Sequence, residues 1–341
     1  MKNIILILNL ALVCNTLKSQ TNYKLSNKIK AEGELGWDYI VADETTNKLF
    51  VSHGNMVQVI DAKAGTIVHT ITDLKGVHGI ALAHDLKKGF ISNGKDSSVT
   101  IFDYETFKVL SNIKVTGANP DAILYDRFSH NVFVYNGRSA NATVIDAKSD
   151  KVVATITLAG KPEFSVTDEK GSIYVNIEDK NIVTLINATT LKVEKTYPLK
   201  DGDEPTGLAI DNNTHRLFVV CGNKKMIVMD AQNGKIIATM PIGEGCDGVA
   251  FDNELKRVYA SNGEGNITVI QEVNATTFKV IETIQTQKGA RTITLNSKTH
   301  HIYTPAAEYE EAPKEATVDN PKKRPKIKAG SFVIFDIEVL K

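Results

Sequence analysis

One position of the chain carries a polar or charged residue of changing type at intervals of about 40 to 44 residues. A position that only supports a repeated scaffold keeps one residue type, whereas this position varies and stays almost entirely polar. Carboxylate, imidazole and guanidinium groups that converge on one ring are the groups that bind and orient a charged ligand. The residues at this position are Asp38, His78, Asp121, Glu163, Thr206, Asp247 and Arg291. We predict a ligand site that contains all of them except Thr206.

The charged members of this ring have a second, structural interpretation. Asp38, Asp121 and Asp247 are candidates to hydrogen-bond the amides of a neighbouring strand and so tie repeats together. Arg291 either neutralises part of the acidic ring or binds a substrate carboxylate through two parallel hydrogen bonds. The sequence leaves both alternatives open.

Imidazole and carboxylate groups together suit several divalent metal ions. His78 and His53 are candidates to ligate a metal with Asp38 or Asp121. No local motif of the HExxH kind is present, so the cofactor stays unidentified and a divalent metal is the one candidate. Otherwise a histidine in a channel is a polar group that hydrogen-bonds water.

His53 belongs to a second predicted ring, at the ends of the strands that follow the first ring. We expect both rings to open into one funnel. Trp37, the only tryptophan, stands where other repeats have Pro120, Pro162 and Pro205. Its ring either stacks on a ligand at the rim or packs in a junction between repeats. The other members of the second ring are Asn93, Asn136, Ile177, Cys221, Asn262 and Ala306.

Cys221 and Cys246 are expected on the same face of neighbouring repeats. A disulfide between them requires Cα atoms within about 7 Å. The alternatives are a site for a soft metal ion and two buried free thiols, because cysteine often packs as a small apolar residue. Two cysteines do not make a disulfide scaffold. No GxSxG elbow, Ser–His–Asp spacing or phosphate-binding glycine loop is present, so nothing supports nucleophilic catalysis.

The elements that position these residues are repeats of the stretch LFVSHGNMVQVIDAKAGTIVHTI, which covers residues 49–71. Each copy holds three short β-branched runs, separated by Gly, Asn, Asp and Lys turns, and follows the ring position. A period near 40 residues is typical of a propeller. We predict an all-β protein, a seven-bladed β-propeller with four-stranded antiparallel blades. Aligned aromatic residues mark the seven copies at Phe50, Phe90, Phe133, Tyr174, Phe218, Tyr259 and Tyr303.

For the first blade the predicted strands are Trp37–Ala42, Lys48–His53, Met56–Asp61 and Ile67–Thr72. An aspartate ends the third strand of most blades, as at Asp61, Asp103, Asp146 and Asp230. Aspartate at the start of a turn accepts hydrogen bonds from the backbone that follows it. We therefore predict that these aspartates cap turns and have no catalytic role.

The two ends of the chain complement each other. The last repeat ends at Val339–Leu340 and lacks its outer strand, whereas Leu25–Lys30 forms an isolated strand before the first repeat. We predict that Leu25–Lys30 is the outermost strand of the seventh blade, which closes the ring and removes exposed edges. An insertion at residues 304–330 contains four prolines and interrupts this blade. It is either a surface loop or a lid over the funnel.

Residues 1–20 have the pattern of a secretory signal peptide, with Lys2 before the apolar run from Ile4 to Val13. Residues 21–341 then form one propeller domain. The bulky Val13 before Cys14 disfavours lipid anchoring, and we expect a soluble periplasmic or extracellular monomer with no transmembrane segment. Without Lys2 and Lys18, the 40 basic and 40 acidic side chains become 38 and 40. This near-neutral balance argues against nucleic-acid binding.

The pairing of F-V-x-N with V-x-V-I-D resembles the YVTN-type repeat of exported bacterial β-propellers, the YncE-like group, over essentially the whole mature chain. The segments CDGVAFD (residues 246–252), SNG (261–263) and GAR (289–291), with the Pro- and Lys-rich insertion, resemble one branch of that group. The resemblance implies the propeller fold and leaves activity open, because members mostly have no assigned function. One relative type binds single-stranded DNA, which the charge balance here does not support.

Two functions follow from these observations. The first is a non-enzymatic exported propeller that binds a ligand or a protein partner on its funnel face. The alternative is a metal-dependent hydrolase, lactonase or lyase that uses the channel carboxylates with His78 or His53. Whether the protein is an enzyme stays open at this stage, with the absence of catalytic motifs favouring a binding protein.

Overall fold

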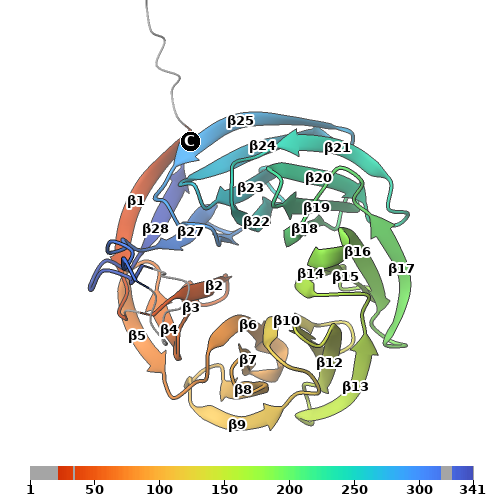
Figure 1. Cartoon of the computed structure of the whole chain (residues 1–341), viewed down its shortest axis with the longest axis horizontal. Coiled ribbons are helices and arrows are strands. Elements are labelled where there is room, and N and C mark those ends of the chain that lie inside the picture. Colours follow the sequence, from red (N-terminus) through yellow and green to blue (C-terminus); the bar gives the residue numbers. More distant parts are fainter. Residues whose placement is uncertain (1–21, 34, 316–324, 341) are drawn as a thin grey trace, which may run out of the picture.

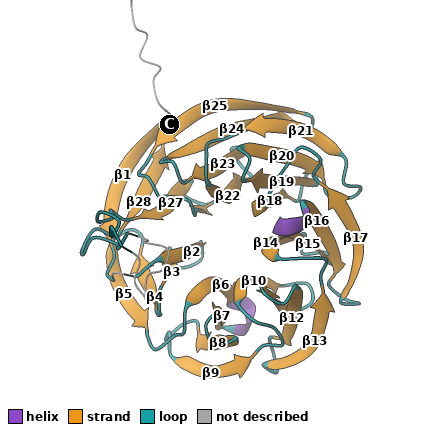
Figure 2. Cartoon of the chain, in the orientation of Figure 1, coloured by secondary structure: helices purple, strands orange, loops and turns teal. Residues whose placement is uncertain are grey.

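The computed structural model describes residues 22–33, 35–315 and 325–340. Seven four-stranded antiparallel sheets surround a central channel as the blades of a propeller (Figure 1). Two single-turn 3-10 helices, η1 (His84–Leu86) and η2 (Glu178–Lys180), are the helices among the described residues (Figure 2). None of these described helices is long and apolar enough to cross a membrane. The predicted fold class is confirmed.

The first four blades follow chain order from the channel outward. The first blade contains β2 (Trp37–Asp43), β3 (Lys48–His53), β4 (Met56–Asp61) and β5 (Thr66–Ile71), and the second contains β6 (Val77–Ala83), β7 (Lys88–Asn93), β8 (Ser98–Asp103) and β9 (Val109–Lys114). The third contains β10 (Pro120–Asp126), β11 (Asn131–Asn136), β12 (Asn141–Asp146) and β13 (Lys151–Thr157). The fourth contains β14 (Pro162–Thr167), β15 (Ser172–Ile177), β16 (Ile182–Asn187) and β17 (Lys192–Pro198).

The last three blades are β18 (Pro205–Asp211), β19 (Arg216–Cys221), β20 (Lys225–Asp230) and β21 (Ile236–Pro241); β22 (Cys246–Asp252), β23 (Arg257–Asn262), β24 (Asn266–Asn274) and β25 (Thr277–Gln285); and β26 (Thr294–Asn296), β27 (His301–Ala306), β28 (Val333–Val339) and β1 (Tyr23–Lys30). In the seventh blade β1 pairs antiparallel with β28, from Tyr23 opposite Val339 to Lys30 opposite Val333. The predicted closure by the N-terminal strand is therefore confirmed.

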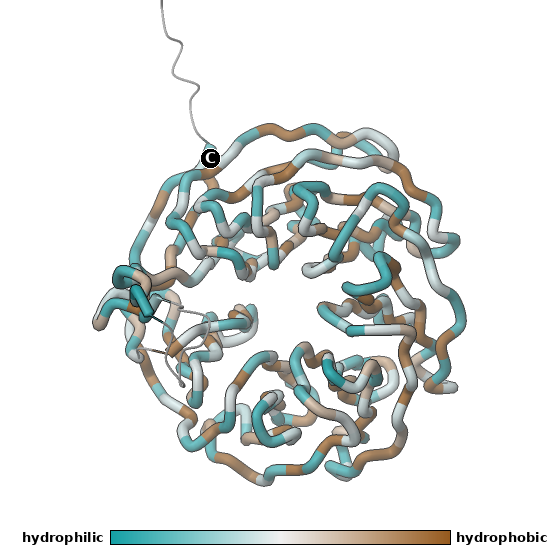
Figure 3. The backbone as a smooth tube through the Cα atoms, in the orientation of Figure 1, coloured by the Kyte–Doolittle hydropathy of each residue, from teal (hydrophilic) through white to brown (hydrophobic). Residues whose placement is uncertain are grey.

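The hydrophobic core lies between neighbouring blades. The second and third strands of each blade are buried on both faces, so their sequences read as continuous apolar runs such as Leu49, Phe50 and Val51. Phe50 of the first blade packs with Ile91 and Phe102 of the second. Apolar segments recur in every blade in the same way (Figure 3). This stacking of each blade on the next holds the inner strands rigidly around the channel.

The turns that leave the third strands are capped as predicted. Asp61 accepts hydrogen bonds from the backbone N–H groups of Lys63 at 3.0 Å and Ala64 at 2.8 Å. The equivalent carboxylates make the same two bonds in other blades, at Asp103 and Asp146. These aspartates are structural.

Candidate functional site

A β-bulge at the start of the inner strand presents the first ring to the channel in six of the seven blades, and Arg291 of the seventh blade precedes its inner strand β26. In β2, Trp37 pairs with His53 and Ile40 pairs with Val51, so Asp38 and Tyr39 together face the single residue Ser52. The same register shift recurs in β6, β10, β14, β18 and β22. Bulges of this kind turn side chains away from the regular alternation of a strand. The bulge therefore directs the side chains of the ring toward the channel, which a regularly alternating strand would not do for all of them.

Serines of the second strands hold these bulges. The hydroxyl of Ser52 donates to the carbonyl of Tyr39 at 3.1 Å, and the hydroxyl of Ser92 accepts the N–H of Gly79 at 2.8 Å. Ser261 donates in the same way to the carbonyl of Gly248. These bonds satisfy backbone groups that the bulge removes from the strand ladder. The serine near the end of the second strand in blades one, two and six is thus part of the site's scaffold.

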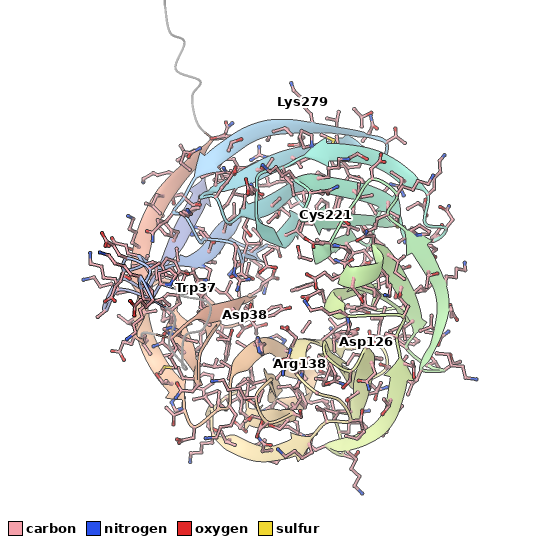
Figure 4. The ribbon with its side chains drawn as sticks, in the orientation of Figure 1. Trp37, Asp38, Asp126, Arg138, Cys221 and Lys279 are labelled. Atoms are coloured by element: carbon pink, nitrogen blue, oxygen red, sulfur yellow. The ribbon has the colours of Figure 1, made fainter. Side chains whose placement is uncertain are left out.

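Three members of the first ring meet at the channel mouth. His78 Nδ1 lies 2.6 Å from Asp38 Oδ2 and 3.6 Å from Asp121 Oδ1, and all three side chains are partly buried. Asp38 lies at the edge of the central opening (Figure 4). The three residues come from β2, β6 and β10, at the same bulge position of three successive blades. The predicted grouping of Asp38, His78 and Asp121 is observed.

Arg291 closes the ring between the sixth and first blades. One of its guanidinium nitrogens, Nη2, lies 3.5 Å from Asp38 Oδ1, and Nη1 forms an ion pair with Asp247 Oδ2. Of the two interpretations of Arg291, neutralisation of the acidic ring is the one that these contacts support.

A second charged group contains Glu163 and two residues that the sequence analysis did not select. Lys161 Nζ lies 2.6 Å from Glu163 Oε1 and also forms an ion pair with Glu178 Oε2. Lys161 directly precedes Pro162 at the start of β14, and Glu178 lies in η2. No repeat position marks these residues, because they come from a loop and a turn of the fourth blade.

The residues of the first ring other than His78 line a cavity of about 570 Å³ in the central channel. The rings of Tyr39 and Phe164 stack inside it, with centroids 5.6 Å apart and planes 18° apart. These two residues were also missed. The sequence contains a pattern that could have identified them. The position directly after each residue of the first ring is glycine or alanine in four blades and is aromatic only at Tyr39 and Phe164. A Cβ at Gly79 would lie 2.9 Å from the carbonyl oxygen of Asp121, so the small residues permit close strand approach.

Crowding of acidic groups changes the protonation of the site. Burial, together with the negative charge of Asp38, raises the pKa of Asp121 to about 6. Burial and the charge of Asp121 raise the pKa of Glu163 to about 7. Burial lowers the pKa of His78, but the hydrogen bond to Asp38 and the neighbouring carboxylates outweigh it and raise this pKa overall. Near neutral pH Glu163 is therefore partly protonated, and a positively charged group in the mouth would favour its ionised form.

The prediction that His53 faces the funnel is wrong. Its side chain is 1% exposed, contacts the backbone carbonyls of Glu32 and Leu35, and packs on Phe332 with ring centroids 4.4 Å apart. The second ring as a whole is buried between strands. Asn93 donates from Nδ2 to the hydroxyls of Ser98 and Thr100 on the third strand. Beyond the bulge of the inner strand, the regular alternation of side chains along the second strand turns the residues of the second ring into the blade and away from the channel.

Trp37 packs in the junction between the seventh and first blades. It is 6% exposed, and its ring centroid lies 5.2 Å from that of Phe332 and 6.2 Å from that of Tyr309. Figure 4 shows Trp37 farther from the central opening than Asp38. Of its two interpretations, junction packing is the one observed. Its indole N–H has no hydrogen-bond partner in the described part of the chain.

The disulfide alternative is not realised, because Cys221 and Cys246 are free, buried thiols. Burial raises the pKa of Cys221 to about 12 and raises the pKa of Cys246 as well. Protonated, buried thiols react slowly. We expect the folded chain without residues 1–20 to show almost no rapid reaction with Ellman's reagent, and the denaturant-unfolded chain to show both thiols. Loss of both thiols under denaturing, non-reducing conditions would contradict this assignment.

The described ends of the insertion pair with each other and do not line the channel cavity. Tyr309 and Ile327 form an antiparallel bridge, and Lys328 Nζ lies 2.8 Å from Glu308 Oε2. Glu308, Tyr309 and Pro325 border a separate groove of about 800 Å³ together with the 287–289 loop. These residues therefore do not support the lid interpretation.

The opposite end of the channel is structural. Buried aspartates end four inner strands, and each accepts a hydrogen bond from a side chain of the following blade. Asp43 contacts His84 at 3.0 Å, Asp126 contacts Thr167 at 2.6 Å, Asp211 contacts Lys256 at 3.2 Å and Asp252 contacts His300 at 2.7 Å. The two mouths thus differ, and the one with Asp38 carries the candidate site.

Fold and site together define the class of this protein, a seven-bladed β-propeller with an acidic channel mouth. No protein-family model and no curated protein matches the sequence. Among solved structures, the chain is similar to one in Kuenenia stuttgartiensis hydrazine synthase, with a TM-score of 0.71 and 15% identity over 80% of this chain and 94% of that one. A chain in a crystal structure of the mitotic checkpoint complex gives a TM-score of 0.75 and 13% identity over 100% and 99%. These likenesses establish the fold alone.

Proposed function

We propose that this chain is an exported, monomeric, non-enzymatic propeller that binds a small, positively charged ligand at the channel mouth that carries Asp38. The observation that carries the proposal is the excess of carboxylates around the cavity. The acidic lining residues at this mouth are Asp38, Asp121, Glu163, Glu178 and Asp247, against the two cations Lys161 and Arg291, whereas Glu44 lines the cavity near the opposite end.

The two cations of the cavity are already paired. Arg291 contacts Asp38 and Asp247, and Lys161 contacts Glu163 and Glu178, as described above. The carboxylate of Asp121 accepts no hydrogen bond from any other described residue. A positively charged group that enters the mouth would meet negative potential in a partly dehydrated site, where charge pairs interact strongly.

The aromatic pair adds a second attraction for such a ligand. Tyr39 and Phe164 present ring faces and edges within the same cavity, next to apolar side chains such as Ile80 and Ile123. A cation over an aromatic ring gains about 0.5–2 kcal/mol, more when water is excluded. An organic amine with an apolar body fits both the charge and the lining.

Export is supported by the leader-like pattern of residues 1–20 and by the resemblance to exported YVTN-repeat propellers. Residues 1–20 lie outside the described part of the chain. Expression with the leader in a bacterium, followed by mass measurement of the chain in the periplasm and medium, tests cleavage near Ser19 or Gln20. Retention of an intact leader in the cytoplasm would contradict export, and light scattering of the pure protein tests the monomer.

Isothermal titration calorimetry tests the ligand class. We expect putrescine and spermidine to bind and the matched acids succinate and tricarballylate not to bind. Asp121→Asn and Glu163→Gln each remove one ionisable carboxylate that a bound cation would hold in its charged form, and each should weaken amine binding about tenfold, the equivalent of about 1.4 kcal/mol. Glu105→Gln, on an exposed turn after β8, is the matched control and should have no effect. Stronger binding of the acids, or an equal effect of all three substitutions, would refute the proposal.

The second candidate is a metal-dependent hydrolase, lactonase or lyase, and the position of His78 between two carboxylates favours it. It requires a metal ion that activates water or polarises a substrate carbonyl. The test is hydrolysis of simple lactones and aryl esters by zinc-loaded protein. Turnover that survives Asp121→Asn would rule out this site as its source.

A further inference from the structure

We propose that Asp38, His78 and Asp121 bind one divalent metal ion of the zinc class through Asp38 Oδ2, His78 Nδ1 and Asp121 Oδ1. This inference goes beyond the proposed function, because metal binding requires neither the amine ligand nor catalysis. It rests on the geometry, the charge and the rigidity of these three residues.

The three ligand atoms have nearly the spacing of a tetrahedral site. His78 Nδ1 lies 2.6 Å from Asp38 Oδ2 and 3.6 Å from Asp121 Oδ1, and all three atoms lie within 4.8 Å of one another. Ligands at zinc–ligand distances of about 2.0–2.2 Å are about 3.3–3.6 Å apart in a tetrahedron. A small rotation of the Asp38 carboxylate away from His78 makes room for the ion.

The charge and the donor types of the cluster favour a zinc-class ion. A metal ion that binds Nδ1 displaces the proton of the hydrogen bond to Asp38 into solvent, and two carboxylates with the resulting neutral imidazole balance a divalent cation. Asp121 accepts no competing hydrogen bond among the described residues. Imidazole with carboxylate suits zinc, nickel and copper, whereas calcium and magnesium prefer sites of oxygen ligands. We therefore expect discrimination against calcium and magnesium.

The propeller scaffold positions the three proposed metal-binding residues in the absence of a metal ion. They stand at equivalent bulges of three stacked blades, and Arg291 Nη2 lies 3.5 Å from the second oxygen of Asp38. A contact of this kind orients a metal ligand from outside the coordination shell. Three protein ligands leave a coordination position that faces the channel cavity, where water or a ligand atom can bind.

Calorimetric titration of chelator-treated protein with zinc chloride tests the site. We expect one zinc ion per chain, with calcium and magnesium chloride giving no binding at the same concentrations. His78→Gln and Asp121→Asn should each weaken zinc binding more than about 100-fold, beyond the 10- to 100-fold typical of outer-shell partners. Glu163→Gln removes a nearby charge without removing a proposed ligand and should change the affinity less than about fivefold.

A substitution at Gly94 tests the position of the His78 imidazole without replacing any of the three proposed ligand residues. A Cβ at Gly94 would lie 2.7 Å from His78 Nε2, so Gly94→Ala should shift the imidazole and weaken zinc binding about tenfold. Gly137 is the equivalent residue of the next blade, and its Cβ would meet no atom closer than 3.6 Å. Gly137→Ala is therefore the matched control and should bind zinc normally. X-ray absorption should report one imidazole among the ligands, and this signal should disappear in His78→Gln.

The two proposals can fail separately. His78→Gln keeps all five carboxylates of the mouth, so it should lose zinc binding and retain spermidine binding. Absence of zinc binding in a folded protein that still binds spermidine would overturn the metal site alone. Zinc binding that is unchanged by His78→Gln and Asp121→Asn would also overturn it. Circular dichroism confirms that each variant is folded.

Discussion

Deletion of residues 22–30 is expected to turn the closed propeller into an aggregating chain. These residues contain β1, which pairs with β28 along its whole length. Their loss exposes the backbone edge of β28, and exposed edges recruit other strands. It also removes Ile29, which is 1% exposed and packs in the junction of the seventh and first blades.

Light scattering and thermal unfolding of the chain from residue 31 onward measure this effect. We expect soluble aggregates and a large loss of the melting temperature. Ile29→Ala should destabilise the full propeller by about 2–4 kcal/mol, as other large-to-small core substitutions do. Lys30→Ala, at an exposed position of the same strand, should change stability by less than about 0.5 kcal/mol. A deletion variant that stays monomeric and melts like the full chain would show that β1 is dispensable.

Asp252→Ala is expected to cost about 2–4 kcal/mol of folding free energy, more than an ordinary turn cap. The carboxylate of Asp252 is fully buried at the end of β22 and accepts the backbone N–H groups of Glu254 and Leu255. It also contacts His300 Nδ1 of the next blade at 2.7 Å. Alanine leaves three polar groups without their partner in a buried junction.

Chemical denaturation compares this variant with Asp61→Ala. Asp61 accepts two backbone N–H groups in a similar turn, but this turn lies at the outer side of a blade, and the carboxylate has no partner in another blade among the described residues. We expect a cost of about 1 kcal/mol for Asp61→Ala. Asp252→Asn should fall between the two, because the amide retains one acceptor oxygen. Equal costs for Asp61→Ala and Asp252→Ala would mean that the contact between blades contributes nothing.

Much of the architecture was predictable because each blade is a local unit of about 40 residues. The predicted strands Lys48–His53 and Met56–Asp61 agree with β3 and β4, and Trp37–Ala42 agrees with β2 within one residue. The pairing of Leu25–Lys30 with the last blade was also predictable, since a closed ring must supply the strand that the final repeat lacks.

The candidate site was only partly predictable. Asp38, His78 and Asp121 share one repeat position, so the fold symmetry brings them to one mouth of the channel. The prediction for His53 failed, because two residues of the bulged inner strand oppose one residue of the second strand. The residue that ends the second strand therefore faces the interior of the blade. Counting alternate positions along the sequence does not reveal this direction, because it does not detect the bulge.

Sequence alone determined the number of blades, the strands within them, the closing strand and the varied polar ring, because all of these follow from local patterns that repeat. Only the tertiary structure decided which side chains meet. Tyr39 and Phe164 belong to blades one and four and stack across the channel, and Arg291 reaches Asp38 from the far end of the chain. Such contacts depend on the radius of the closed ring and on the bulge geometry, and no stretch of the chain encodes either one by itself.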